Sequence, residues 1–174
     1  KYIIYKNKEG EVLYFENENT NGNAWFVDAI ESFETPDEEI LALDKINTKT
    51  TAIANASDLK SKRFVKDSMA SIQLVDYKLN HLVYETKTTE DGFAVFSEVY
   101  YKNGWNATID GVEVKHYNVN YILRGLEIPK GTHTIVFKFN PSVVTTGSNI
   151  SLVSSILLVL LILGQGILIY RKPS

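Results

Sequence analysis

An uninterrupted apolar run near the C-terminus limits what this chain can fold into. From Ile150 to Tyr170 the sequence reads ISLVSSILLVLLILGQGILIY, without one charged residue. A hydrocarbon core of about 30 Å needs roughly 20 apolar residues in a helix. The run is apolar on every side, so it has no polar face to turn toward water. We therefore predict a transmembrane helix over residues 150–170, rather than the buried helix of a soluble domain.

The distribution of charge indicates how the chain sits in a membrane. All acidic residues precede Ile150, and the formal net charge of −3 becomes −5 once Arg171 and Lys172 are set aside. An acidic domain of this kind gives no reason to expect nucleic acid as a partner. Under the positive-inside rule, we expect the tail 171–174 to be cytoplasmic and residues 1–149 to lie on the outer side of the membrane.

The start of the sequence bears on the size of the protein. It begins Lys1-Tyr2-Ile3, with no methionine and no secretory signal. An exported domain of this size needs a preceding segment to direct its export. We therefore expect the chain to be the C-terminal piece of a larger protein whose upstream transmembrane helices are among its partners.

Short β-type segments separated by turn residues fill the part before the apolar run. Asp110-Gly111 is a strong two-residue hairpin signal. Turns recur every 8–12 residues, a spacing typical of an antiparallel sandwich. The expected strands cover residues 2–5, 12–15, 24–33, 51–54, 70–75, 82–86, 93–101, 105–109, 112–114, 121–128 and 133–139.

One short helix interrupts the strands. Thr35 is a good N-cap, Pro36 suits the first helical position, and Glu38 completes a capping box. We expect its apolar stripe to comprise Ile40, Leu43 and Ile46. The predicted fold is mainly β, a jelly-roll-like antiparallel β-sandwich with one short α-helix. The sandwich would occupy residues 1–140, with a short tether at 141–149 before the membrane helix.

Catalytic motifs are scarce. Cysteine is absent, which excludes a disulfide framework and a thiolate metal site. His81, His116 and His133 are scattered over predicted strands and their edges, and we interpret them as surface or strand-pairing residues. The sequence has no phosphate-binding glycine loop, no HExxH and no Gly-x-Ser-x-Gly elbow. We therefore expect no catalytic residue, metal or cofactor in this chain.

A region rich in aromatic residues, 97–126, is the best candidate for a binding site. Aromatic rings stack on sugars, and Asp and Arg side chains hydrogen-bond sugar hydroxyls. The alternative is structural: Trp105 and Tyr100 are core rings, and Arg124 caps a sheet edge or pairs with a carboxylate. The candidate substrate-binding residues are Tyr100, Tyr101, Trp105, Asp110, Tyr121 and Arg124.

Several blocks of sequence occur together in an order that resembles a known family. The densest is Tyr-Tyr-x-x-Gly-Trp-x-Ala-x-Ile-Asp-Gly-x-x-Val at residues 100–114. Further blocks are found at 24–27, 80–84, 93–98, 120–125 and 128–137. Together they resemble the C-terminal region of the bacterial YfhO family of membrane proteins. Lys102-Asn103 departs from the family, which often has proline before this glycine.

The resemblance implies a multi-pass membrane protein similar to the C-type membrane glycosyltransferases. Such enzymes transfer a sugar from a polyprenyl-phosphate lipid to glycans of the cell envelope. Their catalytic acid lies in a loop between early membrane helices, which this chain does not include, so no catalytic residue is carried over. The chain would be an outer accessory domain with the last membrane helix. Its implied partners are the lipid bilayer, the upstream helices and an envelope glycan.

Two other functions remain open from the sequence. The chain is also consistent with a stand-alone, membrane-tethered module that binds carbohydrate or protein. A hydrolase would need two carboxylates roughly 5–9.5 Å apart in a cleft. Glu98 and Asp110 are the candidates for that pair.

Overall fold

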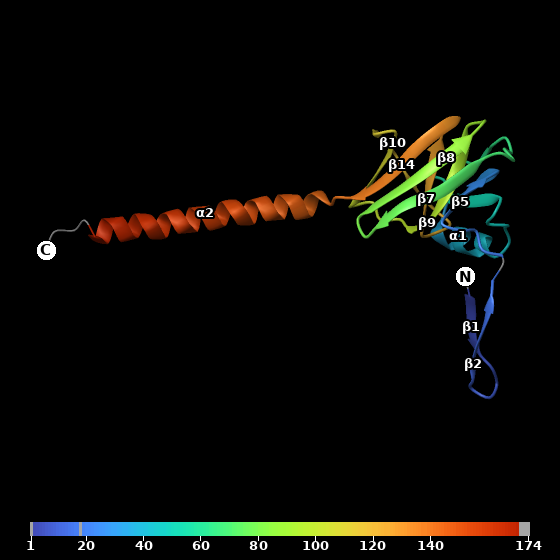
Figure 1. Ribbon diagram of the computed structural model, residues 1–174, viewed down its shortest axis with the longest axis horizontal. Helices are drawn as coiled ribbons and strands as arrows, with labels where there is room; N and C mark the ends of the chain where they lie inside the picture. Colours follow the sequence, from blue (N-terminus) through green and yellow to red (C-terminus); the bar gives the residue numbers. More distant parts are fainter. Residues whose placement is uncertain (1, 18, 171–174) are drawn as a thin grey trace.

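The chain forms a β-rich body from which one long helix departs (Figure 1). The computed structural model describes residues 2–17 and 19–170. The strands within these residues are β1 (Tyr2–Lys6), β2 (Val12–Glu16), β3 (Ala24–Val27), β4 (Ala29–Phe33), β5 (Thr51–Asn55), β6 (Lys62–Arg63), β7 (Ser71–Lys78), β8 (His81–Thr88), β9 (Gly92–Val99), β10 (Trp105–Ile109), β11 (Val112–Val114), β12 (Tyr117–Val119), β13 (Leu123–Ile128) and β14 (Gly131–Phe139). The helices are α1 (Pro36–Leu43) and α2 (Ser142–Tyr170).

Two sheets pack against each other and enclose the main core. One has the strand order β11-β10-β14-β8-β7, and the other has the order β3-β9-β13-β12-β5-β4-β6. Phe96 of the larger sheet packs edge-on against Tyr84 and Phe137 of the smaller one, with ring centres 4.9 Å apart in each pair. All three side chains are fully buried. The mainly β fold with one short helix and a C-terminal apolar helix is thereby confirmed.

The larger sheet is buried on both faces. Phe93 and Val95 belong to a second core on its outer face, where Phe64 and Leu59 pack against it. Ala94 and Phe96 point the other way, into the core between the sheets. Successive residues of a strand face opposite sides of the sheet, so the unbroken apolar run 93–96 serves two cores. The segment 58–67 contains the short strand β6 and covers the second core.

The N-terminal part of the larger sheet departs from the antiparallel pattern. β4 and β5 run parallel and are joined through α1. The single strand expected over residues 24–33 is therefore wrong, because it divides at Asp28 into β3 and β4. The Asp28 N–H donates to the Thr50 carbonyl at 2.7 Å. β3 pairs with β9 at one edge of the sheet, while β4 pairs with β5 and β6 near the other edge.

Helix α1 begins as expected, but the apolar stripe expected from the sequence is only partly buried. The Glu38 N–H donates to the Thr35 hydroxyl, and the Thr35 N–H donates to the Glu38 carboxylate, which confirms the capping box. Ile40, expected in the buried stripe, is 48% exposed. Glu39 and Ala42 are buried instead. The Glu39 carboxylate accepts a hydrogen bond from the Asn55 amide at 2.9 Å, so a polar contact with β5 fixes the rotation of this short helix.

Helix α2 starts earlier than expected and follows β14 almost directly. The tether expected at 141–149 is helical from Ser142 onward, so only Asn140 and Pro141 separate strand from helix. Proline suits the N-terminal edge of a helix, and no proline lies within Ser142–Tyr170. The segment Ser142–Gly166 is long and apolar enough to cross a membrane. Arg171 and Lys172, on which the expected orientation depends, lie outside the described residues.

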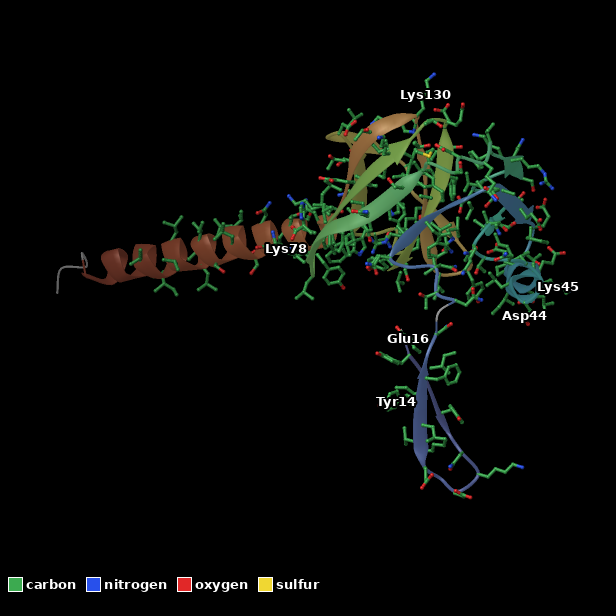
Figure 2. All side chains as sticks on the ribbon, turned by 45° about the vertical axis from the view of Figure 1, so that its right-hand side comes forward. Tyr14, Glu16, Asp44, Lys45, Lys78 and Lys130 are labelled. Carbon is green, nitrogen blue, oxygen red and sulfur yellow. The ribbon has the colours of Figure 1, made fainter. Side chains whose placement is uncertain are left out.

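A separate hairpin, β1–β2, projects from the body. Tyr14 and Glu16, labelled in Figure 2, lie on its second strand. All ten of its strand residues are exposed. The hairpin is held together by its ladder and by edge-on aromatic pairs, such as Tyr2 with Tyr14 at 5.9 Å. It contributes no residue to either core.

Candidate functional site

Three turns meet at the end of the sandwich where β14 continues into α2. The Phe139 N–H donates to the Asn80 carbonyl at 2.9 Å, and the Asn140 N–H donates to the Gly104 carbonyl at 2.7 Å. The Tyr100 N–H donates to the Ile122 carbonyl at 2.8 Å. We call this the helix-proximal end, comprising residues 77–80, 99–105, 120–124 and 139–141. Figure 2 shows Lys78 beside the start of α2 and Lys130 at the far end of the sheets.

The structure divides the six candidate binding residues between the two ends. Five belong to the helix-proximal end: Tyr100, Tyr101, Trp105, Tyr121 and Arg124. Asp110 follows the last residue of β10, five residues beyond Trp105. At about 3.3 Å per residue, this strand separates the two positions by roughly 17 Å. Asp110 therefore belongs to a different surface.

Arg124 is a buried residue of the sandwich, with only 2% of its surface exposed. Its guanidinium carbon lies 4.0 Å from the centre of the Trp105 ring and 5.2 Å from that of Phe137. Its Nε donates to the Val99 carbonyl at 2.9 Å, beside the irregularity in the β9–β13 pairing. Burial lowers the pKa of Arg124, and the nearby Glu98 charge opposes that shift. The residue thus bonds the last residue of β9, an interior strand of the larger sheet, instead of the sheet edge or carboxylate expected from the sequence.

Trp105 is a partly buried ring wedged into the same corner. The Phe139 ring packs against it with centres 5.3 Å apart. Gly104 precedes it and is buried; any Cβ at this position would collide with the Phe139 ring. The glycine is therefore required for close packing of the turn against β14. Arg124 and Phe139 together cover much of the Trp105 ring that a sugar would need for stacking.

Tyr100 and His116 form a half-buried pair next to Arg124, with ring centres 5.2 Å apart. Burial, with a smaller contribution from the Arg124 charge, lowers the pKa of His116 to about 4. The pKa of Tyr100 is raised, mainly by burial. Among the described residues, His116 Nε2, the Tyr84 hydroxyl and Arg124 Nη1 have no hydrogen-bond partner. All three side chains lie against the Phe137 ring, so polar groups are buried at this end of the core.

Tyr121 is held outward by a strained turn. It has φ of 69°, directly after Asn120 with φ of 48°. A left-handed backbone is unusual for a bulky residue and persists only where the surroundings enforce it. Asn120 is buried, and its side-chain oxygen and its N–H bond the N–H and carbonyl of Ile53, each at 2.8 Å. The Asn118 amide donates to the Tyr121 carbonyl at 3.1 Å.

Asp110 locks the far end of the β10–β14 pairing. Its carboxylate lies 2.6 Å from His133 Nδ1 and accepts the Thr134 N–H at 2.8 Å. The His133 contact lowers the pKa of Asp110, and the same contact raises that of His133. Glu98 precedes Val99 at the helix-proximal end of β9, so it cannot form a close carboxylate pair with Asp110. The hydrolase hypothesis therefore loses its candidate residues.

A hollow between the outer strands β3 and β7 was not anticipated from the sequence. It has a volume of about 480 Å³, and its lining includes Trp25, Phe64, Lys66, Asp67 and Gln73. The Asp67 carboxylate accepts the Thr89 N–H at 2.6 Å and the Thr88 hydroxyl at 3.0 Å. Backbone bonds from Thr89 and Met69 are the main causes that lower the Asp67 pKa to about 2. The one sequence signal for this surface is Trp25, in the 24–27 block.

A β-sandwich continuous with one long apolar helix defines a membrane-anchored domain protein. The family model described as bacterial membrane protein YfhO matches residues 17–151. The chain belongs to the YfhO family, as the sequence blocks indicated, and it is a membrane protein. The match begins directly after the β1–β2 hairpin. No curated protein and no solved structure matches the chain.

Proposed function

We propose that this chain is the extracytoplasmic accessory domain and last membrane helix of a multi-pass YfhO-family protein. The whole protein would transfer sugar from a polyprenyl-phosphate lipid to cell-envelope glycans, with catalysis in upstream parts. Membership of a membrane family and the resemblance to C-type glycosyltransferases support this role. In this arrangement residues 1–149 face outward, and Arg171 and Lys172 face the cytoplasm.

The observation that carries the accessory role is the short connection between β14 and α2. Two residues separate them, and the turns at Asn80 and Gly104 are hydrogen-bonded to Phe139 and Asn140. A sandwich bonded this closely to its helix has little freedom to swing away from the membrane. A fixed position suits a domain that holds an acceptor glycan near a membrane-embedded catalytic centre.

The test is to loosen this connection in the full-length protein. A six-residue Gly-Ser insertion after Asn140 should abolish most sugar transfer while leaving donor-lipid binding intact, because only the position of the domain changes. The matched control places the same insertion after Gly111, in the hairpin at the other end of β10. Transfer of radiolabelled sugar from the polyprenyl-phosphate donor is measured in membranes. Absence of transfer by the native protein would refute the glycosyltransferase role, and unchanged transfer after insertion at Asn140 would refute the positional role.

Sidedness has a separate test, because the chain contains no cysteine. A single Val112→Cys should react with a membrane-impermeant maleimide added to intact cells, whereas Ser174→Cys should react only after the cells are opened. The reverse pattern would place the sandwich in the cytoplasm and contradict the proposal.

The second candidate function is a stand-alone module that binds carbohydrate or protein. The aromatic side chains Tyr101 and Tyr121 are 52% and 43% exposed, which favours this candidate. The detergent-solubilised chain should bind a glycan array through these residues. Tyr101→Ala and Tyr121→Ala should each weaken binding at least tenfold without unfolding, because neither ring is in the core. Binding that survives both substitutions would remove these residues from the candidate site.

A further inference from the structure

We propose that the helix-proximal end of the sandwich is a membrane-contact surface whose turns rest in the lipid headgroup region. This inference depends on α2 as a membrane span and not on the proposed glycosyl transfer. Its occupant is the lipid interface itself, because the surface surrounds the point where the chain enters the helix.

Exposed apolar and aromatic side chains concentrate at this end. Leu79, at the tip of the β7–β8 turn, is 93% exposed. Contact between an apolar side chain and water is unfavourable. Clusters of exposed apolar side chains therefore mark interaction sites. Tyrosine is enriched at membrane–water interfaces, where its ring and hydroxyl meet both phases. The other large exposed side chains here are Tyr77, Val99, Tyr101, Tyr121 and Ile122.

The turns that carry these side chains are fixed around the start of α2. Hydrogen bonds from Phe139 to Asn80 and from Asn140 to Gly104 hold two of them directly to the chain entering the helix. The strained backbone at Tyr121 holds the third in an outward position. Figures 1 and 2 both place the β7–β8 turn at the end of the sandwich that carries α2. A bilayer crossed by α2 therefore faces this surface.

A groove between the 101–106 turn and the first turns of α2 adds polar contacts. Its volume is about 820 Å³, and its lining includes Tyr101, Lys102, Asn103, Val144 and Thr145. Lys102 supplies a positive charge for lipid phosphate, while the asparagine and threonine supply hydrogen bonds. This mixture of apolar and polar groups matches the headgroup layer better than it matches hydrocarbon or bulk water.

The length of α2 is compatible with this contact. Its 29 residues span about 43 Å at 1.5 Å per residue. A hydrocarbon core with one headgroup layer measures roughly 36 Å. A tilt of about 30° reconciles the two lengths, within the range seen for membrane helices. Tilting brings one side of the helix-proximal end down onto the headgroups, and interfacial side chains are what fix such a tilt.

The absence of cysteine allows a direct test with single-site labels on the whole chain. Leu79→Cys and Ile122→Cys carry an environment-sensitive nitrobenzoxadiazole dye in vesicles of phosphatidylcholine and phosphatidylglycerol. The matched control is Val112→Cys, which is 69% exposed at the far end of β10. All three sites are exposed, so labelling leaves both cores intact. Far-ultraviolet circular dichroism verifies folding.

We expect headgroup-region doxyl lipids to quench the dye at Leu79, Ile122 or both at least threefold more than at Val112. Quenching at one of the two sites alone supports the proposal and gives the direction of the tilt. Equal quenching at all three sites overturns it. The dye emission could instead be blue-shifted but not quenched by the doxyl lipids, and return to its value in water when the protein is diluted tenfold in lipid. That result would show that a second copy of the chain covers the surface, and it would overturn the proposal.

Discussion

The guanidinium of Arg124 lies over the Trp105 ring, with its central carbon 4.0 Å from the ring centre. The contact joins the two sheets, because Arg124 belongs to β13 and Trp105 to β10. A buried charge is costly unless other groups compensate for lost water. Here the compensation comes from two aromatic faces and the Val99 carbonyl. The contact therefore serves packing and fixes one corner of the sandwich.

Two substitutions of Arg124 should distinguish the contribution of its packing to stability from that of its charge. Arg124→Ala should destabilise the sandwich by about 3 kcal/mol, because it leaves a cavity between Trp105 and Phe137. Arg124→Met should cost at least about 2 kcal/mol less, because it refills the space and removes a buried charge. Urea unfolding of the full chain in detergent, followed by near-ultraviolet circular dichroism, gives both values.

The control for this pair is Lys62→Met, which alters an exposed ion pair with Glu127 and should change stability by less than about 1 kcal/mol. Equal losses for Arg124→Ala and Arg124→Met would show that the charge itself holds the corner together. The packing interpretation would then be wrong.

Local features of the fold were predictable from the sequence because they depend on neighbouring residues. The capping box from Thr35 to Glu38 needs only four consecutive residues, and the structure confirms it. The Asp110-Gly111 hairpin requires left-handed backbone at both positions, and both have positive φ. The apolar helix was evident from composition alone, although its start at Ser142 was not.

Features that depend on distant partners were not predictable. The division of residues 24–33 into β3 and β4 arises because each half pairs with a different strand. Glu39 is buried in α1 because the amide of Asn55, 16 residues away, donates a hydrogen bond to its carboxylate. Trp105 and Arg124, both named as candidate binding residues, lie in contact, but that contact depends on how the two sheets pack. Asp110 was grouped with them by sequence proximity, although strand geometry carries it to the other end.

Stability should depend on pH through Asp110 and His133 in a defined direction. The pKa of His133 is raised above its ordinary value of 6.5, mainly by the hydrogen bond with Asp110. A raised folded-state pKa stabilises the fold fully below pH 6.5 and loses that contribution as pH rises through the raised value. The native chain should therefore lose stability above pH 6.5 relative to His133→Gln. Urea midpoints between pH 5 and 9 measure this difference. A constant difference across the range would contradict an ionised pair.

His116 should produce the opposite dependence in a lower range. Burial lowers its pKa from 6.5 to about 4, so the folded state holds this ring neutral. Between these two values the unfolded chain binds a proton that the folded chain does not, so stability falls as pH decreases from 6.5 toward 4. His116→Phe should flatten this decline, while His81→Gln, at a half-buried histidine of β8, serves as the control. Equal acid sensitivity in native and His116→Phe proteins would show that the ring is not kept neutral by burial.

The β1–β2 hairpin should be energetically independent of the sandwich. All ten strand residues are exposed and none belongs to either core, and an isolated two-stranded hairpin is at best marginally stable in water. Its backbone amides should therefore exchange with deuterium at least a hundredfold faster than those of β8 and β14, which pair across the centre of the smaller sheet. Deleting residues 1–16 should leave the urea midpoint of the sandwich unchanged within error. Slow exchange in the hairpin, or a lower midpoint after the deletion, would show that it packs against another surface in solution.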